Sequence, residues 1–409
     1  MAISSERFAA LMARLELEAR RNPAAYRLRV LALALAGYAY LGGVFALLLL
    51  LIALALSPLV DLKFLAATLA LLLGALTGLA RRAMRVDLPA PRGCALKRGE
   101  APELFALIAE LRGRLRAPRL HHVVVTGDFN ASVTQLPRLG VPGLHRNTLA
   151  IGLPLMKSLG PEQFKAVLAH EIGHLAGGHG RFAGGIYRLR TSWTRLLEAL
   201  AGGNIWGGLL LRPFFEHYAP YFNAVSLPLA RAHEYQADAM AVRLTSRRAT
   251  AEALSAVSVI GSYLGERFWP ILHRKADELP RPAFAPFSGM GNVIPWIEEK
   301  SAHAWLAHAL ARPTGPEDAH PALTDRLRAI GAAPRLALPA PGQAADRLLG
   351  EARTRIAQEL DRDWRRTIRP SWEKRYREVQ ESRARFAGNA CGPEACEAVR
   401  REAGTGYRG

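Results

Sequence analysis

A long run of apolar residues without one charged side chain, Val30–Leu56, constrains this chain more than any other feature of its sequence. About 20 apolar residues cross the hydrocarbon of a bilayer, and a helix satisfies the backbone polar groups there. A second apolar run follows at Phe64–Ala80. The alternatives are a signal peptide for the first run and a buried core helix for the second. The length of the first run and the closeness of the two favour spans. We predict a transmembrane helical hairpin at residues 29–80, after an N-terminal cytoplasmic segment at residues 1–28.

Positive charge flanks both outer ends of this hairpin. The arginines are Arg14, Arg20, Arg21, Arg27 and Arg29 before it, and Arg81, Arg82 and Arg85 after it. Because cytoplasmic flanks carry the excess of Lys and Arg, both ends and the rest of the chain are predicted to face the cytoplasm. The Ala-, Leu-, Arg- and Gly-rich composition indicates a bacterial protein, and hence an integral protein of the inner membrane. The small-residue step Gly74–Gly78 suits helix packing within the hairpin or between the copies of a homodimer.

Three histidines and a glutamate lie within the stretch Ala169–Gly180, AHEIGHLAGGHG. A helix is predicted to begin at Gly160-Pro-Glu and to end at Gly177-Gly178. His170 and His174 are four residues apart, so they point the same way, with Glu171 beside them. Two imidazole ligands and an adjacent carboxylate that takes a proton from bound water are what a zinc protease needs. The alternative is a surface helix with a chance His-Glu-x-x-His, expected in about 2% of such chains.

The third metal ligand is not expected to be His179. The long metzincin pattern places its third histidine at position 180, which is glycine here. One residue turns a helix by about 100°, so we expect His179 to be solvated or to contact a ligand.

A second stretch, Leu229–Met240, offers a better third ligand. Glu234 and Asp238 are four residues apart among small and apolar neighbours, so they face one side of a helix. Buried carboxylates need a positive partner, and zinc supplies one. Glu234 would bind the metal, and Asp238 would accept the second ring N–H of a ligand histidine. The alternative is an exposed pair of acids balanced by Arg231 and Arg243.

These motifs together resemble the integral-membrane zinc metallopeptidases that include HtpX and the CAAX prenyl proteases. The resemblance rests on His170-Glu-Ile-Gly-His174 followed by Glu234-Tyr-Gln-Ala-Asp238. Phe129–Val133 resembles the family's Asn-Ala strand beside the cleft, and Ala319–Arg326 its late His-Pro…Arg motif. The order and spacing agree over about residues 95 to 330. The strand departs from the family pattern after Asn-Ala, so the shape of the substrate pocket does not follow from the resemblance.

The resemblance implies a fold and roles for individual residues. The fold is mainly α with a small β-sheet, an α+β zincin-type metalloprotease domain, here at residues 95–335. One Zn²⁺ per chain would be held by His170, His174 and Glu234. Glu171 would be the general base, and His320 or Arg326 would help to stabilise the oxyanion. His170, the first histidine of the motif, would be the ligand whose ring N–H Asp238 accepts. Asn130, Ala131 and Ser132 would bind an extended substrate at a sheet edge.

The other segments of the chain carry weaker signals. Residues 202–230 are fairly apolar but contain Arg212, Glu216 and His217, which indicates an amphipathic or cleft-wall segment. Residues 336–409 are predicted to be a linker and a basic helical extension with a break at Pro370, docked on the protease domain. The cysteines Cys94, Cys391 and Cys396 form no disulfide framework and are expected to be free thiols in a reducing compartment.

The net charge of +19 is diffuse and unaccompanied by a nucleic-acid motif, so we expect contact with anionic lipid and no nucleic-acid binding. The sequence favours a membrane-anchored zinc endopeptidase that hydrolyses protein or peptide substrates in membrane-protein quality control or processing. The alternative is a catalytically silent membrane scaffold or adaptor on the same domain, although every catalytic position is filled.

Overall fold

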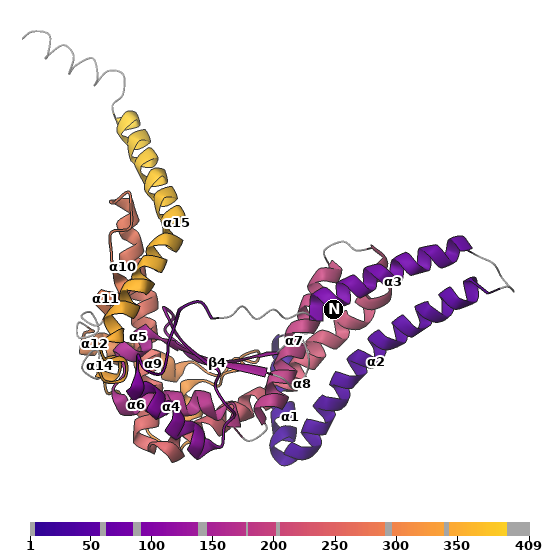
Figure 1. Cartoon of the computed structure of the whole chain (residues 1–409), viewed down its shortest axis with the longest axis horizontal. Coiled ribbons are helices and arrows are strands. Elements are labelled where there is room, and N and C mark those ends of the chain that lie inside the picture. Colours follow the sequence, from indigo (N-terminus) through magenta and orange to yellow (C-terminus); the bar gives the residue numbers. More distant parts are fainter. Residues whose placement is uncertain are drawn as a thin grey trace, which may run out of the picture.

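The chain is mainly α-helical with one small β-sheet, as the sequence predicts (Figure 1). The computed structural model describes residues 5–57, 63–84, 91–137, 145–176, 179–201, 205–290, 297–338 and 343–390. The longer helices are α1 (Ser5–Arg21), α2 (Pro23–Ala55), α3 (Lys63–Met84), α4 (Pro102–Leu115), α6 (Pro161–Gly173), α7 (His179–Ala201), α8 (Ile205–Leu244), α9 (Arg247–Tyr263), α12 (Glu299–Ala311) and α15 (Ala352–Ala390). The shorter helices are α5 (Leu153–Ser158), α10 (Trp269–Arg274), α11 (Pro286–Gly289), α13 (Leu323–Ala329) and α14 (Gln343–Leu349).

The sheet has four strands in the order β1-β2-β4-β3. They are β1 (Cys94–Ala95), β2 (His122–Thr126), β3 (Ala131–Pro137) and β4 (His145–Gly152). β4 lies parallel to β2 and antiparallel to β3, with Ala131 opposite Ile151. The short β2, with Val123, Val124 and Val125 buried, occupies the interior of the sheet, while β3 is an edge strand. An edge strand keeps one row of backbone donors and acceptors for another chain.

One hydrophobic cluster holds the sheet and the helices around α6 together. Leu104 of α4, Ile151 of β4, Phe164 and Leu168 of α6 and Ile260 of α9 are all fully buried in it. Since a Phe, Leu or Ile side chain stabilises by about 1.5–3 kcal/mol when it is fully buried, these contacts fix α6 relative to the sheet.

The C-terminal helices belong to the same cluster. α14 packs on α4, α5 and α6, and Leu348, Ile356 and Leu360 are buried with the cluster. Asp361 of α15 accepts a hydrogen bond from the backbone N–H of Phe287 in α11 at 2.7 Å. The predicted break at Pro370 is wrong: α15 continues through it. Pro370 is exposed, so water can satisfy the carbonyl that loses its helical partner. The break between α14 and α15 comes instead at Gly350, which has a φ of 52°.

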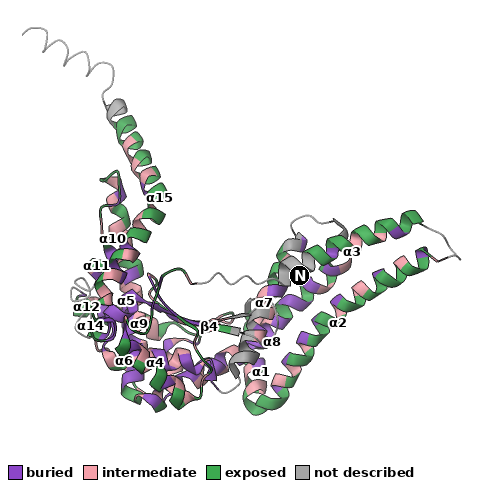
Figure 2. Cartoon of the chain, viewed as in Figure 1, coloured by how far each residue is buried: buried purple, intermediate pink, exposed green. Residues whose placement is uncertain are grey.

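A second cluster joins α1, α2 and α3 to α7 and the first half of α8. α2 and α3 lie side by side as a helical hairpin that extends away from the sheet (Figure 1). Among the described residues, α2 is long and apolar enough to cross a membrane, and α3 contains a shorter apolar stretch, Lys63–Gly78. Much of the outer surface of both helices is exposed (Figure 2). The domain boundaries drawn from the sequence remain a prediction.

Candidate metal centre

The predicted His-Glu-x-x-His stretch lies at the end of α6, in the wall of a cleft. Pro161 opens the helix, and the side-chain oxygen of Gln163 accepts a hydrogen bond from the Gly160 N–H at 3.1 Å. The buried residues Phe164 and Ile172 anchor α6 in the core. The predicted end at Gly177-Gly178 lies outside the described residues; α6 ends at Gly173.

α8 brings the second motif against this helix. Gly173 permits the close approach, because a Cβ there would lie 3.2 Å from the sulfur of Met240. Glu234 is 6% exposed and Asp238 is 1% exposed. The alternative of two exposed acids balanced by nearby arginines therefore does not describe this pair.

Three donor atoms converge where the two helices meet. His170 Nε2 lies 3.1 Å from His174 Nε2 and 3.6 Å from Glu234 Oε2, and His174 Nε2 lies 3.4 Å from Glu234 Oε1. Ligand atoms about 2.1 Å from a tetrahedral metal lie about 3.4 Å from one another. The spacing of two imidazole nitrogens and a carboxylate therefore fits a metal ion, and these three residues are the group that could hold one among the described residues.

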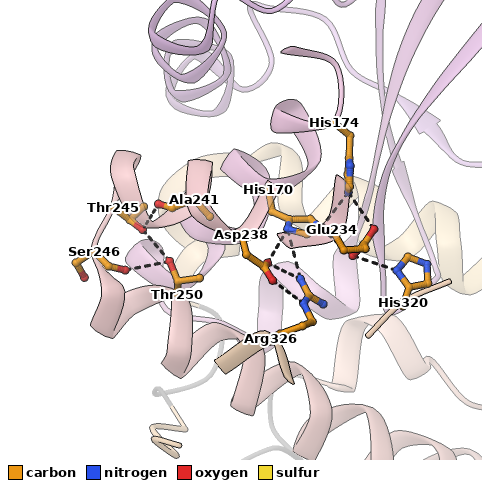
Figure 3. A network of polar contacts seen from close by, with 10 residues as sticks. All are labelled: His170, His174, Glu234, Asp238, Ala241, Thr245, Ser246, Thr250, His320 and Arg326. Atoms are coloured by element: carbon orange, nitrogen blue, oxygen red, sulfur yellow. Dashed lines mark hydrogen bonds and ion pairs between the residues drawn. The ribbon is translucent and has the colours of Figure 1, made fainter. Parts of the chain in front are cut away.

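Asp238 and Arg326 lie on the other side of the His170 ring (Figure 3). His170 Nδ1 is 2.9 Å from Asp238 Oδ1, the partner that the sequence predicts for Asp238. Arg326 donates to both oxygens of the same carboxylate, at 2.8 Å to Oδ2 and 2.6 Å to Oδ1. Because the carboxylate accepts the Nδ1 proton, the Nε2 lone pair of His170 faces His174 and Glu234.

The two carboxylates create a demand for positive charge at this point. Burial opposes ionisation of Glu234, but contacts with His170 and His320 outweigh it and lower its pKa. Burial likewise opposes protonation of His170, but contacts with Asp238 and Glu234 raise its pKa to about 9. Burial lowers the pKa of His174 to about 4. A metal ion would balance the negative charge of the two carboxylates as a proton on His170 does. It would also leave both imidazoles neutral, as metal ligands must be.

Glu171 and the predicted substrate strand line the same cleft, which has a volume of about 510 Å³. Burial raises the pKa of the Glu171 carboxyl to about 7. Asn130, Ala131 and Ser132, at the start of β3, form one wall. Leu254 and Val257 of α9 form part of the lining and were not foreseen, because no motif marks them. α9 is capped by Ser246, whose hydroxyl accepts from the Ala249 N–H at 2.9 Å.

The two residues expected at the oxyanion are placed differently. His320 is exposed in the cleft, and its Nδ1 lies 3.1 Å from Glu234 Oε2. Contact with the Glu234 carboxylate raises the pKa of His320. Arg326 also lines the cleft, but its guanidinium is bound to Asp238 behind His170.

The remaining residues to compare with the sequence predictions are His179, the cysteines and Arg231. His179 is the first residue of α7, after the described part of α6. Cys94 is a buried free thiol, whereas Cys391 and Cys396 lie outside the described residues. Arg231, which the sequence suggests only as a surface counter-charge, is buried on α8 one turn before Glu234. The signal that could have predicted its burial was the position of an arginine within an otherwise apolar stretch.

Comparison with known proteins supports the resemblance. Residues 140–333 match the model of Peptidase family M48, and this stretch contains α6, all of α8 and His320. The match begins after the Asn130–Ser132 strand and ends before α14. Searches of curated proteins and of solved structures found no match. Over residues 140–333, the chain therefore matches peptidase family M48, the family of HtpX and the CAAX prenyl proteases.

Proposed function

We propose that the protein is a membrane-anchored zinc endopeptidase. The observation that carries this proposal is the convergence of His170 Nε2, His174 Nε2 and a Glu234 carboxylate oxygen within 4.8 Å of one another, in the same cleft as Glu171. Two imidazoles and one carboxylate are the protein ligands of a catalytic zinc that keeps its fourth position open. Imidazole donors also disfavour Mg²⁺ and Ca²⁺, which prefer oxygen ligands.

When bound, zinc lowers the pKa of a water molecule and polarises the substrate carbonyl. Glu171 accepts the proton of the attacking water and delivers it to the leaving amine. Its raised pKa supports this exchange, since a catalytic pKa near the working pH favours both halves of the transfer. Asp238 holds His170 in the tautomer that presents Nε2.

His320 and Arg326 are assigned different roles. His320 projects into the cleft beside Glu234, so it is the donor placed to stabilise the oxygen of the attacked carbonyl. Arg326 is bound through two nitrogens to Asp238, so we assign it to holding that carboxylate in place. The free edge of β3 at Ala131 and Ser132 binds the substrate in extended form as an added strand.

The hairpin α2–α3 anchors the protein in the bilayer. Exposed leucines cover α2, and arginines precede it, which supports a cytoplasmic position for both ends and for the catalytic cleft. Substrates are then membrane-associated proteins reached from the cytoplasm, in quality control or processing at a bacterial inner membrane. A homodimer through Gly74–Gly78 stays a prediction; a Cβ on either glycine would meet no described atom within 4 Å.

The full chain in detergent, carrying Glu171→Gln, tests this function. Zinc content should equal that of the parent, while cleavage of casein or a membrane substrate falls by about 100-fold or more, because the general base is lost. Glu162→Gln is the matched control, since Glu162 is exposed in the first turn of the same helix. Cleavage by Glu171→Gln at the parent rate would refute the mechanism. A metal-free parent that keeps its cellular function would support the scaffold alternative.

A further inference from the structure

Arg231 is a buried arginine that joins three separate parts of the molecule. It lies on α8, three residues before the metal-site residue Glu234, and is 6% exposed. Its Nε donates to the carbonyl oxygen of Asp318 at 2.8 Å. Its Nη2 donates to the carbonyl oxygens of Gly315 at 2.6 Å and Pro316 at 3.2 Å. Its Nη1 is paired with the carboxylate of Glu16 in α1.

The three carbonyl oxygens belong to the loop that leads into His320. This loop is also ordered internally: the Gly315 N–H donates to the Asp318 carboxylate at 3.0 Å, and the Ala322 N–H donates to the Thr314 hydroxyl at 2.7 Å. The internal bonds set the shape of the loop but do not attach it to α8. Arg231 supplies that attachment, one turn from the carboxylate that His320 approaches to 3.1 Å.

Glu16 makes the attachment depend on the N-terminal helix. α1 packs on α8 and α2, with Met12 and Leu15 buried in the second cluster. The carbonyl groups around Arg231 bear partial charges, whereas Glu16 contributes a full negative charge to its described contacts. A buried guanidinium that loses its counter-charge is strongly destabilised where it lies, so it will move toward water and release the loop.

We propose that Arg231 is a positioning residue for His320 and that Glu16 holds it in place, so that docking of α1 sets the activity of the cleft. The proposal rests on the proposed protease function. It adds a part of the chain outside the M48 match, α1, to the machinery that places an active-site side chain. A helix directly before the first predicted span thereby gains control over catalysis.

The test compares Glu16→Gln with Glu18→Gln in the full-length protein. Glu18 lies on the same helix but pairs with Arg14 and Arg29 instead of Arg231, so it is a matched control. Because misplacement of a catalytic group by about 1 Å costs up to about 100-fold, we expect Glu16→Gln to lower kcat about tenfold, with KM and zinc content unchanged. Hydrogen exchange should accelerate at residues 313–319. Glu18→Gln should match the parent in all four measurements.

A double-mutant comparison tests whether the effect passes through His320. In a His320→Ala background, Glu16→Gln should cause little further loss of kcat, because the group that it positions is already absent. A full additional tenfold loss there would overturn the proposal. Arg231→Lys, which keeps the charge but not the fork of donors, should also lower kcat and accelerate exchange of the loop.

The failure of this inference differs from the failure of the proposed function. If the parent cleaves and Glu16→Gln equals Glu18→Gln in kcat and in exchange of the loop, the positioning role is wrong and the protease assignment stands. If the parent does not cleave, hydrogen exchange still decides whether Glu16 and Arg231 hold the loop. Equal hydrogen exchange at residues 313–319 in the parent and both variants would by itself refute the role of Glu16 and Arg231 in holding the loop.

Discussion

The hairpin α2–α3 and the core around the metal-site residues place their polar and apolar groups in opposite ways. In α2, one narrow stripe is buried, including Val30, Gly37 and Leu48, while leucines on the other faces are exposed, with Leu47 at 53%. In the catalytic core, apolar side chains are buried and so are charged ones, with Glu234 and Asp238 almost fully covered. The hairpin thus has its apolar surface outside, and the core has its charges inside.

From this difference we infer that the two regions are adapted to different surroundings. A soluble monomer rarely exposes an apolar surface as continuous as that of α2, so this surface fits the hydrocarbon of a bilayer. Buried carboxylates are tolerated in the core because each has positive partners: Arg326 and His170 for Asp238, and His170 and His320 beside Glu234. A change that reverses either pattern should therefore be costly.

The largest effect is expected from a charge on the exposed face of α2. Leu47→Arg should raise the apparent free energy of membrane insertion of α2 by about 2.5–3.5 kcal/mol, since an arginine near the middle of a span must leave water. Leu47→Ala is the control and should change it by less than about 1 kcal/mol. A glycosylation reporter fused to α2 measures both. If the unaltered α2 fails to insert, the exposed leucines face something other than lipid.

A smaller effect is expected from removal of a buried charge in the core. Asp238→Asn keeps the shape but weakens the acceptor for His170 and leaves Arg326 without its counter-charge, so zinc affinity or cleavage should fall about 10–100-fold. Asp363→Asn, an exposed acid paired with Arg366, should change neither. Competition with a chelator measures the affinity. Equal zinc affinities of Asp238→Asn and Asp363→Asn would show that the contact between Asp238 and His170 does not contribute to zinc binding.

The smallest effect should come from the buried stripe of α2. A Cβ at Gly37 would lie 2.6 Å from the Tyr218 hydroxyl, which donates to the Leu33 carbonyl oxygen at 2.6 Å. Gly37→Ala must displace this ring, so we expect the free energy of unfolding to fall by about 1–3 kcal/mol. The higher helix propensity of alanine should offset part of this loss. At Gly42 a Cβ meets nothing within 4 Å, so Gly42→Ala should be neutral or slightly stabilising. Thermal unfolding in detergent compares them, and equal melting temperatures would contradict the packing of α2 on α8.

Local patterns predicted much of the fold because they depend on neighbouring residues. The apolar runs predicted the helices of the hairpin, although α2 begins earlier, at Pro23, where the Asn22 side chain accepts from the Ala25 N–H at 3.1 Å. The spacing of His170 and His174 predicted their shared face of α6. The spacing of Glu234 and Asp238 did the same for α8.

Contacts between distant residues could not be predicted in this way. Arg231 and Glu16 lie far apart in the chain, and no periodicity connects them. The same holds for Lys157, which donates to the carbonyl oxygen of Phe287 at 2.5 Å, and for Asp361, which binds the backbone of the same residue. Such buried polar groups find their partners only through the three-dimensional packing. For the same reason, the sequence did not predict which residues of α14 and α15 are buried in the core.

Metal analysis of the purified full-length protein tests the central claim most directly, namely that motifs on α6 and α8 form one metal centre. The parent should hold one equivalent of zinc. Glu234→Ala should hold much less, because it removes a ligand, whereas Glu216→Ala should keep the full equivalent, since Glu216 is exposed on the same helix and paired with Arg212. A Glu234→Ala protein that retains one tightly bound zinc would contradict the account.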